Sequence, residues 1–259
     1  MVTVIAVVAA KGGVGKSTIA ANLGTALCQT GRAILSIDLD PQNALHLHLG
    51  GNPEDIHGLS RASVGGTPWR NACVRSVSGV YVLPFGQVND TDLQTLERQI
   101  ASDPNWLSNH LRSLNLNSDT VVILDTPPGS SEYLRQALGA ADLVISVLLA
   151  DAASYPTLPM IENMIQRYSG ARPGRLGHVC IVNQVDAARL LSKDSVHLIQ
   201  SALGDRVIGV VHEDQAVSES LARGRTVVEA DPYSLGRKDL MQCADWILRR
   251  LKTRADAAL

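Results

Sequence analysis

The stretch that decides the fold is Ala10-Lys11-Gly12-Gly13-Val14-Gly15-Lys16-Ser17-Thr18. It follows the apolar run 2–9, which predicts a buried strand. Apolar residues recur after it at helical spacing, at Ile19, Leu23, Ala26 and Leu27. Glycines between a strand and a helix let backbone N–H groups converge on one anion, and the positive end of the helix faces the same anion. The stretch therefore predicts a binding loop for phosphate groups.

The residue types in this loop assign the phosphates to a nucleotide. Lys16 would reach the β- and γ-phosphates, and the Ser17 hydroxyl would ligate Mg²⁺. The predicted ligands are a nucleoside triphosphate and Mg²⁺. The predicted nucleotide-binding residues in the loop are Gly12, Gly13, Val14, Gly15, Lys16, Ser17 and Thr18. The alternative is a glycine-rich turn without a ligand, and the complete Gly15-Lys16-Ser17 in this position argues against it.

Short apolar runs along the chain predict the architecture. They are near-continuous, as in strands buried on both faces of a parallel sheet. These runs cover residues 2–9, 33–37, 80–83, 121–124, 143–149, 179–182 and 207–211. Helical patterns lie between them, so we expect an α/β fold with a doubly wound, mostly parallel sheet flanked by helices. The stretch 58–68 is rich in Gly, Ser and Pro and predicts a loop, and we expect one domain over residues 1–259.

Two predicted strands end in acidic residues. One is followed by Asp38-Leu39-Asp40-Pro41-Gln42-Asn43, and the other ends in Asp125 before Thr126-Pro127-Pro128-Gly129. Carboxylates at the carboxyl ends of parallel strands face the ligand crevice of such sheets. We expect Asp125 in the Mg²⁺ shell and the Gly129 N–H near the γ-phosphate. The alternative for the first acidic segment is an Asp-Pro turn that caps the next helix.

The segment Lys11-Gly12-Gly13-Val14-Gly15-Lys16-Ser17-Thr18 resembles the deviant P-loop of the ParA/MinD ATPases. Position 10, where the general motif has glycine, is alanine, and Lys11 is an additional lysine. The resemblance implies that Lys11 reaches the nucleotide of a second subunit, so that a homodimer sandwiches two ATP molecules. It also implies that Asp40 orients or activates the attacking water, whereas Asp38 holds a Mg²⁺-bound water. Lys11, Lys16 and Asp40 are therefore the expected catalytic residues.

Two later segments indicate where the base would bind. Asn183 follows a late apolar run, and its amide offers a donor and an acceptor to the edge of adenine. The segment 210–214, including Val211, is expected to supply the opposite wall. The family often has Pro-Arg there, whereas this chain has Val211-His212. A structural asparagine at the end of a strand is the alternative for Asn183.

Composition excludes several classes of protein. The net charge of −2 and 3% aromatic residues argue against specific nucleic-acid binding. The longest apolar runs are far shorter than the roughly 18 residues of a membrane helix. The four cysteines, Cys28, Cys73, Cys180 and Cys243, form no CxxC pair, so we expect a reducing, cytoplasmic environment. None of them lies near the segment 125–129 at the end of the second acidic strand, which argues against an iron–sulfur reductase.

Two further features have structural readings. His46 and His48 are two residues apart, so we expect them to point to different sides in surface or packing roles. The basic, amphipathic segment 244–254 is expected to pack on the sheet through Trp246, Ile247, Leu248 and Leu251. Direct membrane binding by this segment is the alternative.

Three stretches narrow the resemblance to the BcsQ/YhjQ proteins of bacterial cellulose-synthesis operons. They are residues 82–86, 148–155 and 212–217. This resemblance implies an ATPase that assembles or positions the cellulose synthase or export complex. Its partners would be synthase subunits and a small accessory subunit, and recruitment to the inner membrane would occur through these partners. Hydrolysis is expected to be slow and partner-stimulated, because no catalytic arginine is identifiable and such a residue contributes about 10³–10⁵ in rate.

Three other functions remain open from the sequence. They are a ParA-type partition ATPase that binds DNA, a MinD-type positioning ATPase on membranes, and a nucleotide-binding scaffold with negligible turnover. The basic residues Arg223, Arg225, Arg237 and Lys238 would support the first, although acidic neighbours dilute their charge.

Overall fold

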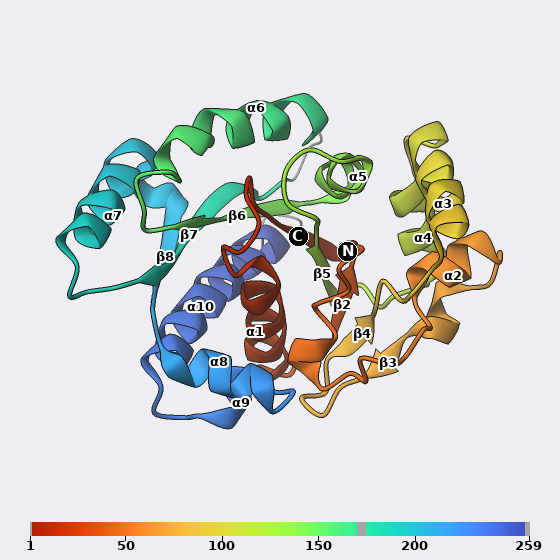
Figure 1. Cartoon of the computed structure of the whole chain (residues 1–259), viewed down its shortest axis with the longest axis horizontal. Coiled ribbons are helices and arrows are strands. Elements are labelled where there is room, and N and C mark those ends of the chain that lie inside the picture. The colour runs from red at the N-terminus through yellow and green to blue at the C-terminus, as the bar shows by residue number, and fades with distance from the viewer. Residues whose placement is uncertain (1, 170–174, 257–259) are drawn as a thin grey trace.

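The fold is built on one twisted sheet, as the computed structural model shows for residues 2–169 and 175–256 (Figure 1). Eight strands lie in the described residues, in the order β3-β4-β2-β5-β1-β6-β7-β8. The strands are β1 (Thr3–Val8), β2 (Ile34–Asp38), β3 (Val74–Arg75), β4 (Tyr81–Leu83), β5 (Val121–Asp125), β6 (Leu143–Leu149), β7 (Gly177–Val185) and β8 (Val207–His212). Only the pairing of β3 with β4 is antiparallel among them.

Helices cover both faces of the sheet (Figure 1). One face carries α1 (Lys16–Cys28), α8 (Gln215–Ala222), α9 (Val227–Ala230) and α10 (Leu235–Asp256). The other face carries α2 (Leu59–Val64), α3 (Asp90–Ser102), α4 (Trp106–Ser113), α5 (Glu132–Ala140), α6 (Leu158–Ser169) and α7 (Leu190–Leu203). Short 3₁₀ turns lie at Leu47–Leu49, Trp69–Ala72, Tyr155–Thr157 and Gly204–Arg206.

Strand β1 shows why the apolar runs are near-continuous. Ile5 and Val7 pack into the core beneath α1 and α10, whereas Ala6 and Val8 pack into the core on the opposite face. All six residues of the strand are buried. Successive side chains point to opposite faces, so a strand covered on both sides must be apolar at every position. The predicted doubly wound, mostly parallel α/β sheet is confirmed.

The predicted elements agree closely with those observed. Each of the seven apolar runs overlaps a strand, and the stripe after residue 18 is the buried face of α1. The pattern of apolar runs did not predict β3, because this strand consists of two exposed residues and contains no apolar run. A single domain over residues 1–259 stays a prediction.

The prediction of a loop over residues 58–68 is wrong, because α2 occupies Leu59–Val64. The helix is held by tertiary contacts. The N–H groups of Leu59 and Ser60 donate to the carbonyls of Pro84 and Phe85 at 2.9 and 3.1 Å. Gly58 permits this approach, because a Cβ there would lie 2.4 Å from the backbone nitrogen of Gly86. Composition could not reveal such a contact with a distant segment.

The last helix packs on the sheet as predicted. Ile247 and Leu251 of α10 are buried in the core beneath it, and Trp246 packs against the same core. Within the described residues, no helix is both long and apolar enough to span a membrane. All four cysteines are free thiols.

Two partly or fully buried histidines predict acid sensitivity. Burial lowers the pKa of His48 from about 6.5 to about 4, and burial followed by the charge of Arg206 does the same for His178. The unfolded chain therefore takes up protons that the folded chain does not, so stability falls as the pH drops from 6.5 towards 4. We expect each histidine to cost about 2 kcal/mol of unfolding free energy between pH 7 and pH 5.

Urea unfolding of wild type and His178→Gln at both pH values measures this effect. The variant should lose less stability on acidification, whereas His57→Gln, at an exposed position, should behave like wild type. Equal acid sensitivity of wild type and His178→Gln would contradict the assignment.

Candidate functional site

The glycine-rich loop forms a cradle between β1 and α1. Gly13 and Gly15 have φ angles of 77° and 83°, in the left-handed region that favours glycine. α1 begins directly after them at Lys16, so its free N–H groups face the cradle. The side chain of Asn183, at the end of β7, donates from Nδ2 to the Val14 carbonyl at 2.8 Å. The loop is thereby anchored to a strand far away in the sequence.

A buried ion cluster lies beneath this cradle. The Lys16 Nζ lies 2.6 Å from Asp125 Oδ1 and 3.7 Å from Asp40 Oδ2. Asp38 and Asp125 are directly paired in register on the neighbouring parallel strands β2 and β5. These contacts bring four of the predicted residues together, Lys16 and the three carboxylates. All four side chains are buried.

The acidic members of the cluster have raised pKa values. Burial raises the pKa of Asp125, although the ammonium of Lys16 and the hydroxyl of Ser17 oppose the shift. Burial, followed by the charge of Asp125, raises the pKa of Asp38 well above its usual range. Three carboxylates around one ammonium leave an excess of negative charge, so an added cation would be stabilised here.

The donors suit a Mg²⁺ ion that also binds phosphate. The Asp125 Oδ2 atom is buried and accepts no hydrogen bond within the described residues. Among the described residues, no group of three or more His, Cys, Asp or Glu side chains could hold a metal. Mg²⁺ bound with nucleotide phosphates uses one or two protein oxygens and several waters. Ser17 and Asp125 therefore fit the predicted ion.

Asp38 organises the loop that carries Asp40. Its Oδ1 accepts from the backbone N–H of Asp40, and its Oδ2 accepts from that of Leu45, both at 2.9 Å. Asp40 Oδ1 in turn accepts from the Gln42 N–H at 3.0 Å. We call residues 39–45 the first switch loop. The predicted contact of Asp38 with a Mg²⁺-bound water stays a prediction.

Residues 126–130, which we call the second switch loop, are docked on the end of β1. The Gly129 N–H donates to the Ala9 carbonyl at 3.0 Å, and the Thr126 hydroxyl donates to the Val7 carbonyl at 2.9 Å. A bond from Gly129 to a γ-phosphate would have to replace the bond to Ala9. The predicted role of Gly129 therefore requires a movement of this loop.

Lys11 is exposed at the tip of the cradle. Its ammonium donates to the Ala153 carbonyl at 2.5 Å. The loop carrying Ala153 is ordered by Ser154, whose Oγ accepts from the Leu149 N–H at 3.2 Å. Lys11 thus has a partner within its own subunit, and its predicted contact across a dimer remains a prediction.

A cavity of about 510 Å³ opens beside the cradle. Gly15 and Thr18 line it, together with Asn183 of β7 and residues of the segment after β8. The other lining residues include His48, Val211, His212, Asp214 and Leu240. Asn183 and Val211, both predicted for the base site, therefore share one cavity next to the phosphate cradle.

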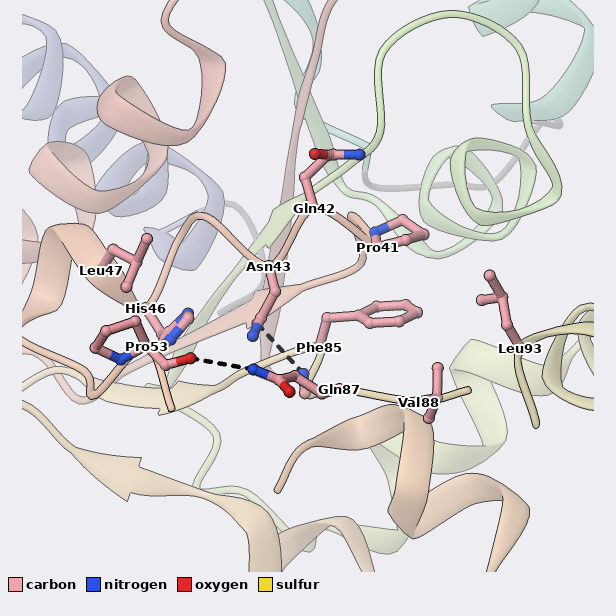
Figure 2. Close-up of a pocket in the computed structure, with 11 residues that line it drawn as sticks. Pro41, Gln42, Asn43, His46, Leu47, Pro53, Phe85, Gln87, Val88 and Leu93 are labelled. Atoms are coloured by element: carbon pink, nitrogen blue, oxygen red, sulfur yellow. Dashed lines mark hydrogen bonds between the residues drawn. The ribbon is translucent and has the colours of Figure 1, made fainter. Parts of the chain in front are cut away.

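A second cavity of about 380 Å³ lies on the other side of the first switch loop. Figure 2 shows Asn43, His46 and Phe85 around it. The Asn43 Oδ1 accepts from the Gly86 N–H at 3.2 Å, which fastens the loop to the end of β4. His46 is only 4% exposed, and neither ring nitrogen has a hydrogen-bond partner within the described residues.

The two histidines point to different sides, as predicted. His46 lines the cavity of Figure 2, whereas His48 lines the cavity beside the cradle and lies 3.5 Å from the Thr18 hydroxyl. Both are buried, so the packing role applies and the surface role does not. Sequence reasoning missed that His48 borders the cavity beside the cradle, because a 3₁₀ turn after the first switch loop carries no sequence pattern that indicates the direction of its side chains.

Comparisons with known proteins identify similar sequences over nearly the whole chain. The family profile for "Cellulose biosynthesis protein BcsQ" matches residues 2–248. The chromosome partitioning protein ParA of Caulobacter vibrioides is 30% identical over 97% of this chain and 96% of its own length. The BcsQ protein of Salmonella typhimurium is 26% identical over 92% of this chain and 91% of its own length.

A solved structure shares the fold. The cobyrinic acid a,c-diamide synthase of Mycobacterium smegmatis, with bound ADP and magnesium, superposes with a TM-score of 0.79 at 25% identity. The match covers 97% of this chain and 96% of that one.

The cradle geometry predicts a specific effect of one methyl group. A Cβ at Gly15 would lie 2.4 Å from the Asn183 Nδ2, at a φ that side chains rarely adopt. Gly15→Ala should therefore break the anchor to Val14 and weaken ATP binding by at least about fivefold, because one hydrogen bond contributes about 1 kcal/mol and the cradle also loses its shape. Calorimetric titration with Mg-ATP measures the loss.

Gly31→Ala is the matched control. Gly31 has a similar φ of 85°, but nothing lies within 4 Å of its Cβ position. Both variants should lose about 1–2 kcal/mol of stability from backbone strain, while only Gly15→Ala loses affinity for ATP. Equal ATP affinities in the two variants would contradict the proposed cradle.

Proposed function

This chain belongs to the BcsQ family of cellulose biosynthesis proteins, and on that premise we propose that it is a dimerising ATPase switch. Its ATP-bound dimer would support assembly or positioning of a bacterial cellulose synthase or export complex. The observation that carries the proposal is the buried Lys16, which bridges Asp125 and Asp40 directly beneath the glycine cradle.

ATP fits the two adjoining features. Its phosphates would lie on the N–H groups of the cradle, and its base would enter the cavity between Asn183 and Val211. The related synthase of Mycobacterium smegmatis, solved with ADP and magnesium, supports this choice of ligand. A Mg²⁺ ion held by Ser17 and Asp125 would neutralise phosphate charge.

Lys16 couples phosphate binding to the carboxylates. When its ammonium turns to the β- and γ-phosphates, Asp125 and Asp40 lose their counter-charge. Asp40 is then free to accept a proton from water. The water oxygen bonds to the γ-phosphorus, the bond from that phosphorus to the β-bridging oxygen breaks, and ADP and phosphate leave.

Turnover by the isolated protein would be slow. No arginine lines the cavity beside the cradle among the described residues. An arginine that stabilises the transition state contributes about 10³–10⁵ in rate. We propose that a partner, such as a synthase subunit or a small accessory protein, accelerates hydrolysis and recruits the protein to the inner membrane.

The first switch loop connects the nucleotide to a surface for partners. Asp40 lies at its catalytic end, and Asn43 lines the cavity of Figure 2. The backbone bonds to Asp38 hold both ends of this loop. Loss of the γ-phosphate would therefore change the shape of the second cavity as well as the catalytic site.

Lys11 is proposed to bridge to the nucleotide of the second subunit. Lys11→Ala should keep nucleotide affinity within about threefold, because the cradle N–H groups and Lys16 remain, but lose dimerisation with ATP. Light scattering after size exclusion, with Mg-ATP or Mg-ADP, measures the molar mass. Lys252→Ala, at an exposed position on α10, is the control and should dimerise normally. A Lys11→Ala dimer that persists with ATP would refute the bridge.

Asp40 is proposed to act on the water. Asp40→Ala should lower the hydrolysis rate by about 10²-fold or more and accumulate an ATP-bound dimer. Phosphate release and molar mass are measured on the same sample, with Asp245→Asn as a surface control. Normal turnover by Asp40→Ala would remove this carboxylate from the reaction.

The same variant tests the biological partner. Tagged Asp40→Ala would be crosslinked in the native cell, purified and analysed by mass spectrometry. Recovery of cellulose synthase subunits is the expected result. Recovery of DNA with a centromere-binding protein would favour partition, a second candidate supported by the 30% identity to ParA of Caulobacter vibrioides. Tight partner binding with no hydrolysis would instead indicate a scaffold.

A further inference from the structure

His212 ends β8 and lines the same cavity as Asn183, which lies on the neighbouring strand β7. Its side chain is 31% exposed, and its ring is fixed by a buried residue of another element. Asp239 of α10, which is 7% exposed, accepts two hydrogen bonds at one oxygen. The His212 backbone N–H donates to Asp239 Oδ2 at 3.0 Å, and the ring Nδ1 lies 2.8 Å from the same atom. One oxygen of Asp239 thus fixes both the backbone and the ring of His212.

This contact determines which ring nitrogen carries the proton. An ionised carboxylate only accepts hydrogen bonds, so Nδ1 must be the protonated nitrogen of a neutral ring. The other nitrogen, Nε2, then presents a lone pair on the side of the ring away from Asp239. The Asp239 contact therefore makes His212 a hydrogen-bond acceptor at the wall of the cavity.

Two other polar side chains that line the cavity, Asn183 and Asp214, are already engaged. Asn183 uses its Nδ2 to hold the Val14 carbonyl. Asp214 accepts from the Ala216 N–H at 2.9 Å, and its second oxygen accepts from Ser234 and Gly236 at 2.7 and 2.9 Å. These bonds lower the pKa of Asp214, led by the Gly236 N–H, so it stays an ionised structural group.

We propose that His212 determines the base specificity of this site. Its Nε2 accepts a hydrogen bond from the 6-amino group of adenine, and Asp239 is the positioning residue that sets the tautomer. A purine with a 6-oxo group would place a second acceptor against Nε2, so both lone pairs would lose their partners. The inference rests on the proposed function, because it assumes that a nucleoside triphosphate occupies this cavity.

The test compares three nucleotides that differ by single groups. Inosine triphosphate replaces the 6-amino group of ATP by an oxygen, and 2′-deoxy-ATP lacks only a ribose hydroxyl. Affinities would be measured by calorimetry with Mg²⁺ for wild type, His212→Ala and His212→Phe. Wild type should prefer ATP over inosine triphosphate by about 10-fold to 100-fold, as expected for an unpaired polar group.

Both His212 variants should bind ATP and inosine triphosphate within about threefold of each other, while the ratio of ATP to 2′-deoxy-ATP stays as in wild type. Asp239→Asn keeps an acceptor oxygen and should keep the preference for ATP. Asp239→Leu removes the acceptor and should lose the preference. Thermal unfolding of each variant verifies that it is folded.

Four results would overturn the inference. A preference for ATP retained in both His212 variants would exclude His212 as the group that reads the base. A change only in the ratio of ATP to 2′-deoxy-ATP would place His212 at the ribose. If wild type binds ATP and inosine triphosphate equally well, only the proposed role of His212 in base recognition is refuted. If wild type binds no nucleotide, the ATPase proposal is refuted as well.

Discussion

The ion pair between Lys16 and Asp125 is the contact on which the rest of the site depends. Its two partners come from the start of α1 and the end of β5, and both are buried, with Asp125 at 0% exposure. Removing either charge would leave the other buried without compensation, which costs several kcal/mol, about 3–5 in comparable proteins. If Lys16 turns to a phosphate group, Asp125 and Asp40 lose their positive partner. Another cation must then compensate these two carboxylates. The site is thus arranged to exchange one set of charges for another.

Parallel strands explain how this cluster was predictable. Asp38 and Asp125 stand at the ends of apolar runs, and parallel pairing in register places them side by side. The glycines and Lys16 follow β1, which lies on the other side of β5, so the carboxyl edge of the sheet collects all of them. The residue types, their order in the chain and their positions at strand ends were enough to predict this cluster. Parallel strands place their carboxyl ends at one edge of the sheet, so residues that follow different strands meet there.

Contacts between distant segments could not be predicted in the same way. Nothing in the pattern around Asp239, on the far helix α10, indicates that it holds His212. The unusual Val211-His212 was visible as a departure from the family, but its partner was not. The helix α2 was missed for the same reason, since its first N–H groups bond to carbonyls at the end of β4. Sequence reasoning locates the carboxyl edge of the sheet, with its buried ion cluster, better than the walls of the cavity beside it.

The most direct measurement of the central claim is the affinity of Lys16→Gln for Mg-ATP. Glutamine keeps a hydrogen-bond donor for Asp125 but removes the positive charge, and thermal unfolding shows whether the variant is folded. The account predicts a folded protein whose affinity for ATP falls by at least about 100-fold, since charge-assisted bonds to phosphate contribute about 1.5–3 kcal/mol each. A folded variant that binds ATP as tightly as wild type would contradict the account.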